Sequence, residues 1–392
     1  MRICKYLSFV LLYLRFCSGF TCTKVVKTKI DMKVKTLSDD EINLATMELL
    51  KISSAHFTSQ ALHSFVELEI ADIISNKSLS LQEISEQIGP NTNKDALLRI
   101  LRLLTSVDII ENEYINDTFV FRLTNTGYLL QTKLHQPSMA SCVNHWLEDP
   151  LWNVGQHLTP FIRGDDETLG KDPFTLRNGV SSDFYYNKND HPQSLQYAND
   201  FVRFISDSEI NAVVHGGIQW FKYDNKVILD VGGFNGKLLS AIHDQYPKLI
   251  CKSLDLPQVI DNIEQKQQHV ELIPGDIFDP SSIPKCDVII LKHFLDRCMW
   301  TETETECILK TCYNALPNDG VIIIFDAVIP DAREEEGKAI QLSLDFLYML
   351  VGRERQRTKE EWRVLVEKTG LTIDEVIDTH IPTCSAIVLT KA

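Results

Sequence analysis

The sequence lacks paired cysteine motifs, an excess of basic residues and long hydrophobic segments. Its ten cysteines form no C-x-x-C pair, which argues against a disulfide framework or a zinc site, and no metal ligands are predicted. Asp and Glu number 54 against 39 Lys and Arg, and the formal net charge is −15. This charge argues against a nucleic-acid partner, because binding phosphates requires clustered cations. The 17 Gly and 14 Pro among 392 residues are typical of globular proteins, and the length suits more than one domain.

The first thirty residues differ in composition from the rest of the chain. No acidic residue precedes Asp31, Leu7 to Leu14 form a short apolar run, and Cys17 to Gly19 are small residues suited to cleavage. The run is too short to span a bilayer, so no stable membrane span is predicted. We interpret residues 1–30 as a signal-like targeting segment rather than a disordered tail. It would direct the chain to the secretory pathway or an organelle, a plastid included, and an uncleaved segment would indicate the cytoplasm.

Residues 31–135 show a helical pattern followed by two short strands. The predicted elements are helices over residues 54–75, between Ser80 and Gly89, and over 95–104, then strands over 109–113 and 118–123. Ser80 and Glu83 are spaced as a capping box. Three helices and a hairpin predict a winged helix. Because its third helix offers few basic residues in an acidic chain, a packing or dimerisation role is favoured over DNA binding.

Residues 136–225 are expected to form a helical connecting region that carries many aromatic side chains. Such side chains can wall a pocket for a flat substrate, or they can form the core between two domains. The aromatic residues are Trp146, Trp152, Phe161, Phe174, Phe184, Tyr185, Tyr186, Tyr197, Phe201 and Phe204.

Residues 226–392 alternate strand and helix patterns, which predicts a Rossmann-like, doubly wound α/β domain with a parallel sheet. A glycine turn, Gly232 to Gly236, follows an apolar strand and precedes a helix. Asp255, at the tip of a second apolar strand, can accept hydrogen bonds from two ribose hydroxyls. Asp230 precedes the glycines, where its carboxylate would repel a pyrophosphate but not a sulfonium or an amino group. The residues therefore predict S-adenosyl-L-methionine as the cofactor.

Six segments, in order, resemble the small-molecule O-methyltransferases of the plant caffeate and animal hydroxyindole type. The segments are residues 229–236, 254–260, 274–278, 291–295, 308–317 and 352–362. The resemblance implies a homodimer and a methyl acceptor that is a small, aromatic molecule with a hydroxyl or carboxyl group. It also implies a role for each of several residues: Gly232 under the methionine part, Asp255 on the ribose, Leu256 and Ile277 around the adenine, Asp276 on its amino group, and Lys292 in the same pocket. A helix N-cap is the alternative role for Asp276.

The chain departs from this family at the catalytic base. Relatives have a His-Asp-Trp triplet here. Matched from Lys292, the corresponding residues are 296–298, beginning with Asp296; matched from Trp300, they are Cys298 and Met299, and neither match gives histidine. Asp296 is the predicted base, and nearby His293 is the alternative. The carboxylates that support the base would be Asp326 and Glu354, with Gln356 as the other match for the latter. A protein that binds the cofactor without catalysis, or a fold-mate with different chemistry, remains the competing hypothesis.

Overall fold

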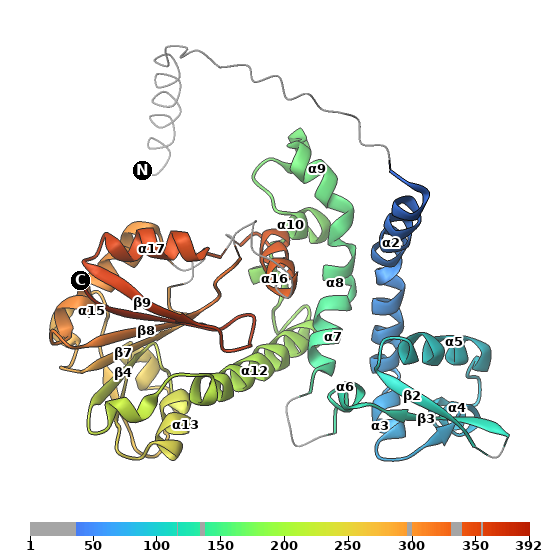
Figure 1. Cartoon of the computed structure of the whole chain (residues 1–392), viewed down its shortest axis with the longest axis horizontal. Helices are drawn as coiled ribbons and strands as arrows, with labels where there is room; N and C mark the ends of the chain where they lie inside the picture. Colours follow the sequence, from blue (N-terminus) through green and yellow to red (C-terminus); the bar gives the residue numbers. More distant parts are fainter. Residues whose placement is uncertain (1–36, 116, 134–137, 296–299, 331–338, 354–355) are drawn as a thin grey trace, which may run out of the picture. The chain divides into compact units, whose positions relative to one another are not determined.

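A computed structural model describes residues 37–115, 117–133, 138–295, 300–330, 339–353 and 356–392 (Figure 1). The chain divides into two compact units, residues 1–55 and 56–392. The expected targeting segment, residues 1–30, lies outside the described residues and stays a prediction. Within the described ranges, no helix is both long and apolar enough to cross a membrane.

The N-terminal helices begin with α2 (Asp39–Glu67) and the short α3 (Ile70–Ile74). The single helix expected over 54–75 is therefore interrupted, and helix α2 begins earlier than the apolar pattern indicated. The interruption lies at Glu69, whose φ of 51° is left-handed and cannot continue a helix. After this turn Ile70 and Ile74 are buried in the same core as Phe65.

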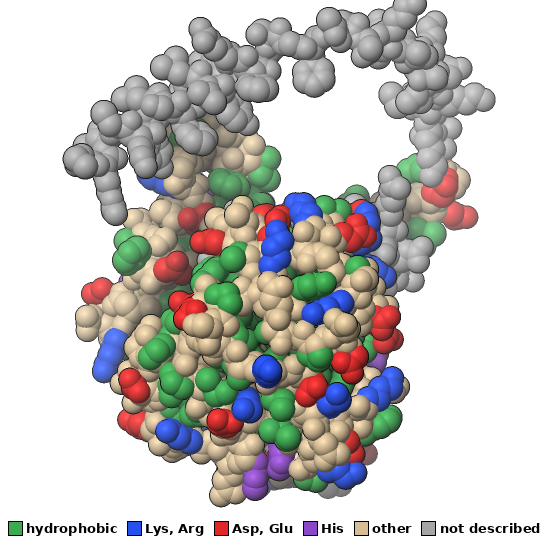
Figure 2. Space-filling view, turned by 90° about the vertical axis from the view of Figure 1, so that its left-hand side faces the viewer, with side chains coloured by type: hydrophobic (Ala, Val, Ile, Leu, Met, Phe, Trp, Pro, Cys, Tyr) green, Lys and Arg blue, Asp and Glu red, His purple; other side chains and the backbone are tan. Residues whose placement is uncertain are grey.

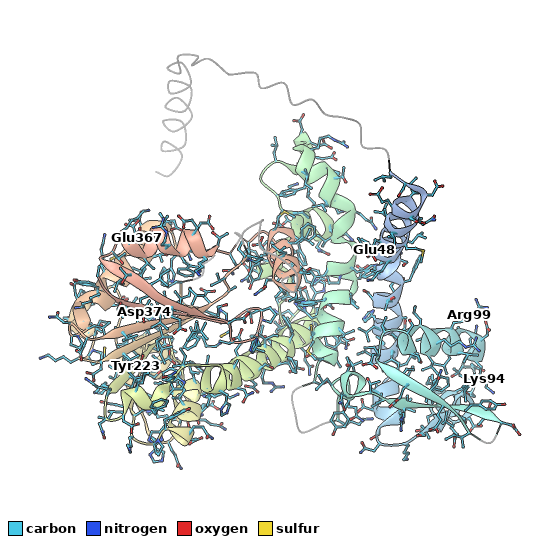
Figure 3. All side chains as sticks on the ribbon, viewed as in Figure 1. Glu48, Lys94, Arg99, Tyr223, Glu367 and Asp374 are labelled. Atoms are coloured by element: carbon cyan, nitrogen blue, oxygen red, sulfur yellow. The ribbon has the colours of Figure 1, made fainter. Side chains whose placement is uncertain are left out.

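The expected capping box and hairpin are confirmed. Ser80 and Glu83 exchange the two capping hydrogen bonds at the start of α4 (Leu81–Ile88), and α5 (Lys94–Thr105) follows. Strands β2 (Ile110–Ile115) and β3 (Thr118–Leu123) pair antiparallel, and β1 (Leu79–Ser80) pairs with β3. Two basic side chains of α5, labelled in Figure 3, contact neighbours in this region: Arg99 pairs with Asp95 (3.0 Å) and Lys94 donates to Gln82.

A series of helices connects this region to the large sheet. They are α6 (Asn125–Tyr128), α7 (Ala140–Leu147), α8 (Asp149–Trp152), η1 (Asn153–His157), α9 (Leu158–Arg163), η2 (Asp166–Thr168), α10 (Pro173–Asn178), α11 (Ser182–Tyr185), α12 (Pro192–His215) and η3 (Trp220–Tyr223). The long α12 packs on α7 and on α13 (Lys237–Gln245), so one continuous helix contacts both the aromatic region and the sheet domain (Figure 1).

The sheet has seven strands in the order β6-β5-β4-β7-β8-β10-β9. Its strands are β4 (Val227–Val231), β5 (Ile250–Asp255), β6 (Val270–Pro274), β7 (Val288–Lys292), β8 (Val321–Asp326), β9 (Leu371–Ile377) and β10 (Ser385–Lys391). The first five are parallel, as predicted, but β10 runs antiparallel to both β8 and β9. The connection from β9 to β10 is too short for the crossover that a parallel pair requires, so a hairpin forms instead.

Helices cover the sheet, and two apolar clusters lie on it. The helices are α13 (Lys237–Gln245), α14 (Pro257–Ile260), η4 (Pro280–Ser282), α15 (Glu302–Ala315), α16 (Ala339–Leu350) and α17 (Lys359–Glu367). One cluster includes Trp362 with Leu229, and the other includes Trp220 with Ile228. Because Ile228 and Leu229 are successive residues of β4, their side chains point to opposite faces, so both faces are buried. Figure 2 shows acidic and basic side chains interspersed on the outer face of this domain.

Candidate active site

The glycine turn after β4 leaves room for close packing at the carboxyl edge of the sheet. Gly232 has a φ of 74°, and a Cβ built there would lie 2.7 Å from the ring of Phe294. A Cβ on Gly233 would lie 2.5 Å from Ser253 Oγ and 2.6 Å from Asp230 Oδ2. Both positions therefore require glycine, and their bare backbone is what a ligand can approach.

Asp255 is held in place by the glycine turn. The backbone N–H of Phe234 donates to Asp255 Oδ2 (3.1 Å), and that of Leu256 donates to Asp255 Oδ1 (2.8 Å). A carboxylate oxygen can accept more than one hydrogen bond, so each oxygen keeps capacity for a ligand hydroxyl. This arrangement fits two adjacent ribose hydroxyls, as the sequence predicted.

A pocket lies between this turn and the ends of β5 and β6. It is lined by Val231, Gly232, Leu254, Asp255, Leu256, Gly275, Asp276, Ile277, Phe278, Phe294 and Trp300. Leu256 is 39% exposed, whereas Ile277 is buried in the core, so they present different amounts of surface to a flat ring. Asp276 Oδ1 accepts from the N–H of Phe278 (2.9 Å), which is a turn-stabilising bond that leaves the second oxygen for a ligand amino group. Five of the six residues expected to bind the cofactor line this pocket.

Asp230, at the base of the turn, is almost fully buried. Burial raises the pKa of its carboxyl to about 7, and the charge of Asp255 adds to this rise while Lys292 opposes it. Asp230 is not among the residues that line the pocket, so its expected place beside a cationic group of the cofactor stays a prediction. The bare glycines and the two-oxygen cradle of Asp255 fit S-adenosylmethionine.

Lys292, the sixth residue expected in the pocket, is not among its lining residues. Its Nζ lies 2.5 Å from Oε2 of Glu209, a residue of α12 whose carboxylate is 2% exposed. Glu209 Oε1 accepts in addition from the hydroxyl of Thr383, in the loop between β9 and β10. Burial would raise the pKa of Glu209, but the hydrogen bonds and charges of His293 and Lys292 lower it to about 2. Glu209 is therefore an anion that joins three segments at the carboxyl edge.

His293 lies between Glu209 and Asp326. Its Nε2 is 2.9 Å from Glu209 Oε1, and its Nδ1 is 3.7 Å from Asp326 Oδ1, which is beyond hydrogen-bonding distance. Burial would lower the pKa of the imidazole, but the close approach of Asp326, the hydrogen bond to Glu209 and the negative charges of both carboxylates raise it to about 9. The backbone of His293 has a φ of 50°, which is strained for a non-glycine residue.

The described residues bring together two of the four predicted catalytic side chains, His293 and Asp326. The other two, Asp296 and Glu354, lie outside the described residues and stay predictions. Gln356, the other match for Glu354, is buried, and its N–H donates to Asp345 Oδ1 (3.0 Å). Glu209 was missed at the sequence level. The sequence does contain one indication of it: Glu209 is an acidic residue one turn before Ala212 and Val213, which are buried on the apolar side of an amphipathic helix.

Two family models match this chain over most of its length. Residues 158–372, more than half of the chain, match the O-methyltransferase domain, and residues 50–133 match the O-methyltransferase dimerisation domain. The chain belongs to the O-methyltransferase family. S-adenosylmethionine is accordingly the methyl donor of this O-methyltransferase, and the region at residues 50–133 is its dimerisation domain.

The match between the O-methyltransferase and its curated relatives covers nearly the whole length of those relatives. Tabersonine 16-O-methyltransferase of Catharanthus roseus is 25% identical over 86% of this chain and 94% of its own, and pluviatolide O-methyltransferase of Sinopodophyllum hexandrum is 28% identical over 86% and 90%. Among solved structures, CalO1, a methyltransferase of calicheamicin biosynthesis in its S-adenosylhomocysteine-bound form, has a TM-score of 0.73 at 21% identity over 91% of this chain and 100% of its own. Human N-acetylserotonin methyltransferase in complex with S-adenosylmethionine has a TM-score of 0.65 at 18% identity over 89% and 98%. These structures support the fold.

Proposed function

We propose that the O-methyltransferase methylates a hydroxyl group of a small aromatic acceptor and that His293 removes the hydroxyl proton. The observation that carries the proposal is the position of the imidazole: it lies between two buried carboxylates at the same sheet edge as the cofactor pocket. The next residue, Phe294, lines that pocket and packs on Gly232. Proton acceptor and methyl donor would therefore be neighbours.

The hydrogen bond to Glu209 gives the two imidazole nitrogens different tasks. Nε2 donates to Glu209 Oε1, so in the neutral ring the lone pair is on Nδ1, which has no hydrogen-bonding partner among the described residues. A hydroxyl approaching Nδ1 would pass its proton there, and Glu209 and Asp326 would stabilise the imidazolium that forms. Bound S-adenosylmethionine supplies an electrophilic methyl group to the resulting oxygen nucleophile.

The strength of the base matters because the protons of phenols are difficult to remove. Transfer from a phenol of pKa ~10 to an ordinary carboxylate is uphill by about 8 kcal/mol, against about 5 kcal/mol for an ordinary histidine. The raised pKa of His293 narrows this gap further. An anionic partner thus makes this histidine a better match to a phenol than the unmodified side chain.

The aromatic character of the acceptor rests on relatives and on the connecting helices. The curated names refer to O-methylation of tabersonine, pluviatolide and myricetin. In this chain, several of the aromatic residues singled out in the sequence pack together beside α16: Trp146, Phe174, Tyr185, Tyr186 and Phe201. A wall of rings suits a flat acceptor.

The proposal is tested by incubating the purified protein with S-adenosylmethionine and a panel of phenols, aromatic carboxylic acids and amines. Mass spectrometry should detect a product heavier by one methylene group for at least one phenol, together with S-adenosylhomocysteine in equal amount. Formation of methyl esters alone would redirect the proposal to carboxylates, which need no strong base. Cofactor binding without any methylated product would favour the non-catalytic alternative.

We also propose that the protein is a homodimer formed through the dimerisation domain. Several large apolar side chains of α2 are exposed in the single chain, among them Leu44 (71%) and Ile52 (70%). Burying such side chains against a second copy would stabilise the pair by roughly 25 cal/mol per Å².

Light scattering at micromolar concentration should show a dimer. The double variant Leu44→Glu, Ile52→Glu should be a monomer, while Lys94→Gln on α5 should remain a dimer; a monomeric wild type would contradict the proposal.

A further inference from the structure

Buried polar atoms without hydrogen-bond partners are concentrated in one region of the molecule. Of nine such atoms among the described residues, five belong to α7, to the residue after it and to Tyr186. They are Asn144 Oδ1, His145 Nδ1, Trp146 Nε1, Glu148 Oε1 and Tyr186 OH. Folded proteins leave few buried polar groups unsatisfied, because each costs about 1–3 kcal/mol. A group of five in one place therefore indicates a site whose partners are supplied by a ligand.

Aromatic rings surround these atoms. The ring of His145 is 5.2 Å from Tyr186 and 5.7 Å from Phe201, measured between centroids, and Trp146 is 5.3 Å from Phe201. On the other side, Phe174 is 6.0 Å from Tyr186. Such a set of ring faces attracts a cation, since each face carries partial negative charge.

A carboxylate faces the same rings. The side chain of Glu148 is 13% exposed; its Oε2 accepts from Ser194 Oγ (2.7 Å), and its Oε1 has no hydrogen-bond partner among the described residues. The nearest cationic candidate is His145 Nδ1 at 3.8 Å, too far for a hydrogen bond. Burial raises the pKa of Tyr185, Tyr186 and Tyr197, and the negative charge of Glu148 is the next largest cause of the rise for each of them, so the three phenols lie near this carboxylate.

We propose that Glu148 and the surrounding rings bind a positively charged nitrogen of the methyl acceptor, so that the substrate class is a phenolic amine. This inference rests on the proposed hydroxyl methylation, and it adds the charge of the acceptor. Three of the unsatisfied atoms are acceptors, on Asn144, His145 and Glu148, if the His145 proton is on Nε2. An ammonium group carries up to three N–H donors and would satisfy them, whereas a neutral amide or ether would leave the carboxylate unpaired.

Helix α12 connects this amine site with the proposed base. Ser194, Tyr197 and Phe201 belong to the amine site, and Glu209, which binds His293, follows on the same helix. Ser194, which donates to Glu148, and Glu209 are fifteen residues apart on this helix, which corresponds to about 22 Å along its axis and to a rotation of about 60° around it. An acceptor that reaches both ends would carry its amine and its hydroxyl at opposite ends of an aromatic framework of comparable length.

The experiment compares phenolic alkylamines of increasing length, beginning with tyramine, with their N-acetyl amides, which are neutral. Binding to the full-length protein loaded with S-adenosylhomocysteine is measured by calorimetry at pH 7, so the readout does not depend on turnover. At least one of the amines should bind to the wild-type protein at least ten-fold more tightly than the corresponding amide does. Glu148→Gln, which keeps the shape and removes the charge, should abolish this preference. Glu167→Gln, the same change at an exposed position in the same region, should retain it.

Each outcome decides the inference. Equal or tighter binding of the amides to the wild type would overturn it, as would an undiminished amine preference in Glu148→Gln. If Glu148→Gln does not fold, the comparison of amines with amides in the wild-type protein decides instead. Tyr186→Phe is then the second variant, and it should weaken amine binding by less than ten-fold. Methylation of amides but not of amines would leave the proposed function standing and remove this inference. An amine preference that depends on Glu148, without any methylated product, would support the site and contradict the proposed function.

Discussion

Replacing His293 by glutamine is expected to lower the turnover number on a phenol by ~10²–10⁴-fold, the usual range for loss of a general base. Glutamine can keep a hydrogen bond to Glu209 but cannot accept the proton. The dissociation constant for S-adenosylhomocysteine should change little, because His293 does not line the cofactor pocket. Rapid-quench or steady-state assays with calorimetry on the same samples separate the two effects.

The pH dependence should identify the same residue. Because the pKa of His293 is raised to about 9, the imidazole stays protonated at neutral pH and the base form appears only as pH rises through that value. Wild-type activity should therefore rise with pH up to about 9 and then level off. The free energy of unfolding should change with pH in the opposite direction. The ion pair with Glu209 stabilises the fold fully below the ordinary pKa of histidine, and this contribution is lost as pH rises through about 9. Glu209→Gln should move the rising limb of activity to lower pH.

Two variants serve as comparisons for His293→Gln. His215→Gln changes an exposed histidine at the end of α12 and should keep full activity. Asp296→Asn tests the other predicted base directly. If Asp296→Asn lowers turnover while His293→Gln does not, Asp296 is the base and the environment of His293 is structural.

The thermal stability of Glu209→Gln must be measured together with its pH profile. This variant leaves Lys292 without its carboxylate partner, and unpaired buried charges are strongly destabilising.

The cofactor half of the site could be predicted from the sequence because it is built from contiguous motifs. A strand, a glycine turn and a helix follow each other between residues 227 and 245, and Asp255 ends the adjacent strand. In a parallel sheet, residues at the ends of neighbouring strands must meet at one edge. Local patterns together with this topological rule were sufficient to place Gly232 and Asp255 around one pocket, whereas the role of Asp276 came from the family resemblance.

The base region could not be predicted in this way, because it depends on distant contacts and on an irregular backbone. Glu209 is 84 residues from His293, and no spacing rule connects them. Alternation at a strand end would send the side chains of Lys292 and His293 to opposite faces. The positive φ of His293 breaks that alternation, so both side chains reach the same carboxylate. The prediction of a wholly parallel sheet was also wrong at β10, although the connection between β9 and β10 is too short for a parallel pair and indicates a hairpin.

The second large effect is expected at Asp255. Asp255→Ala should weaken binding of S-adenosylhomocysteine by about 2–4 kcal/mol, because two hydrogen bonds from ribose to an ionised group are lost. The structure adds a second contribution: the same carboxylate accepts from the N–H groups of Phe234 and Leu256, so its removal also releases the glycine turn. Calorimetry with S-adenosylhomocysteine measures the total. Asp261→Ala, which removes an exposed carboxylate just after α14, is the matched control and should bind normally.

The two contributions at Asp255 can be separated with a ligand that lacks the ribose hydroxyls. If the carboxylate acts mainly on the ribose, the wild type should bind 2′,3′-dideoxy S-adenosylhomocysteine about as weakly as Asp255→Ala binds the natural ligand. If it acts mainly by holding the turn, the dideoxy ligand should bind the wild type well while Asp255→Ala binds neither. Unchanged affinity in Asp255→Ala for the natural ligand would contradict both explanations, and with them the placement of the ribose at the end of β5. The strained φ of Phe234, 50°, makes a contribution from the turn a specific expectation, since that backbone loses its only side-chain acceptor among the described residues when Asp255 is removed.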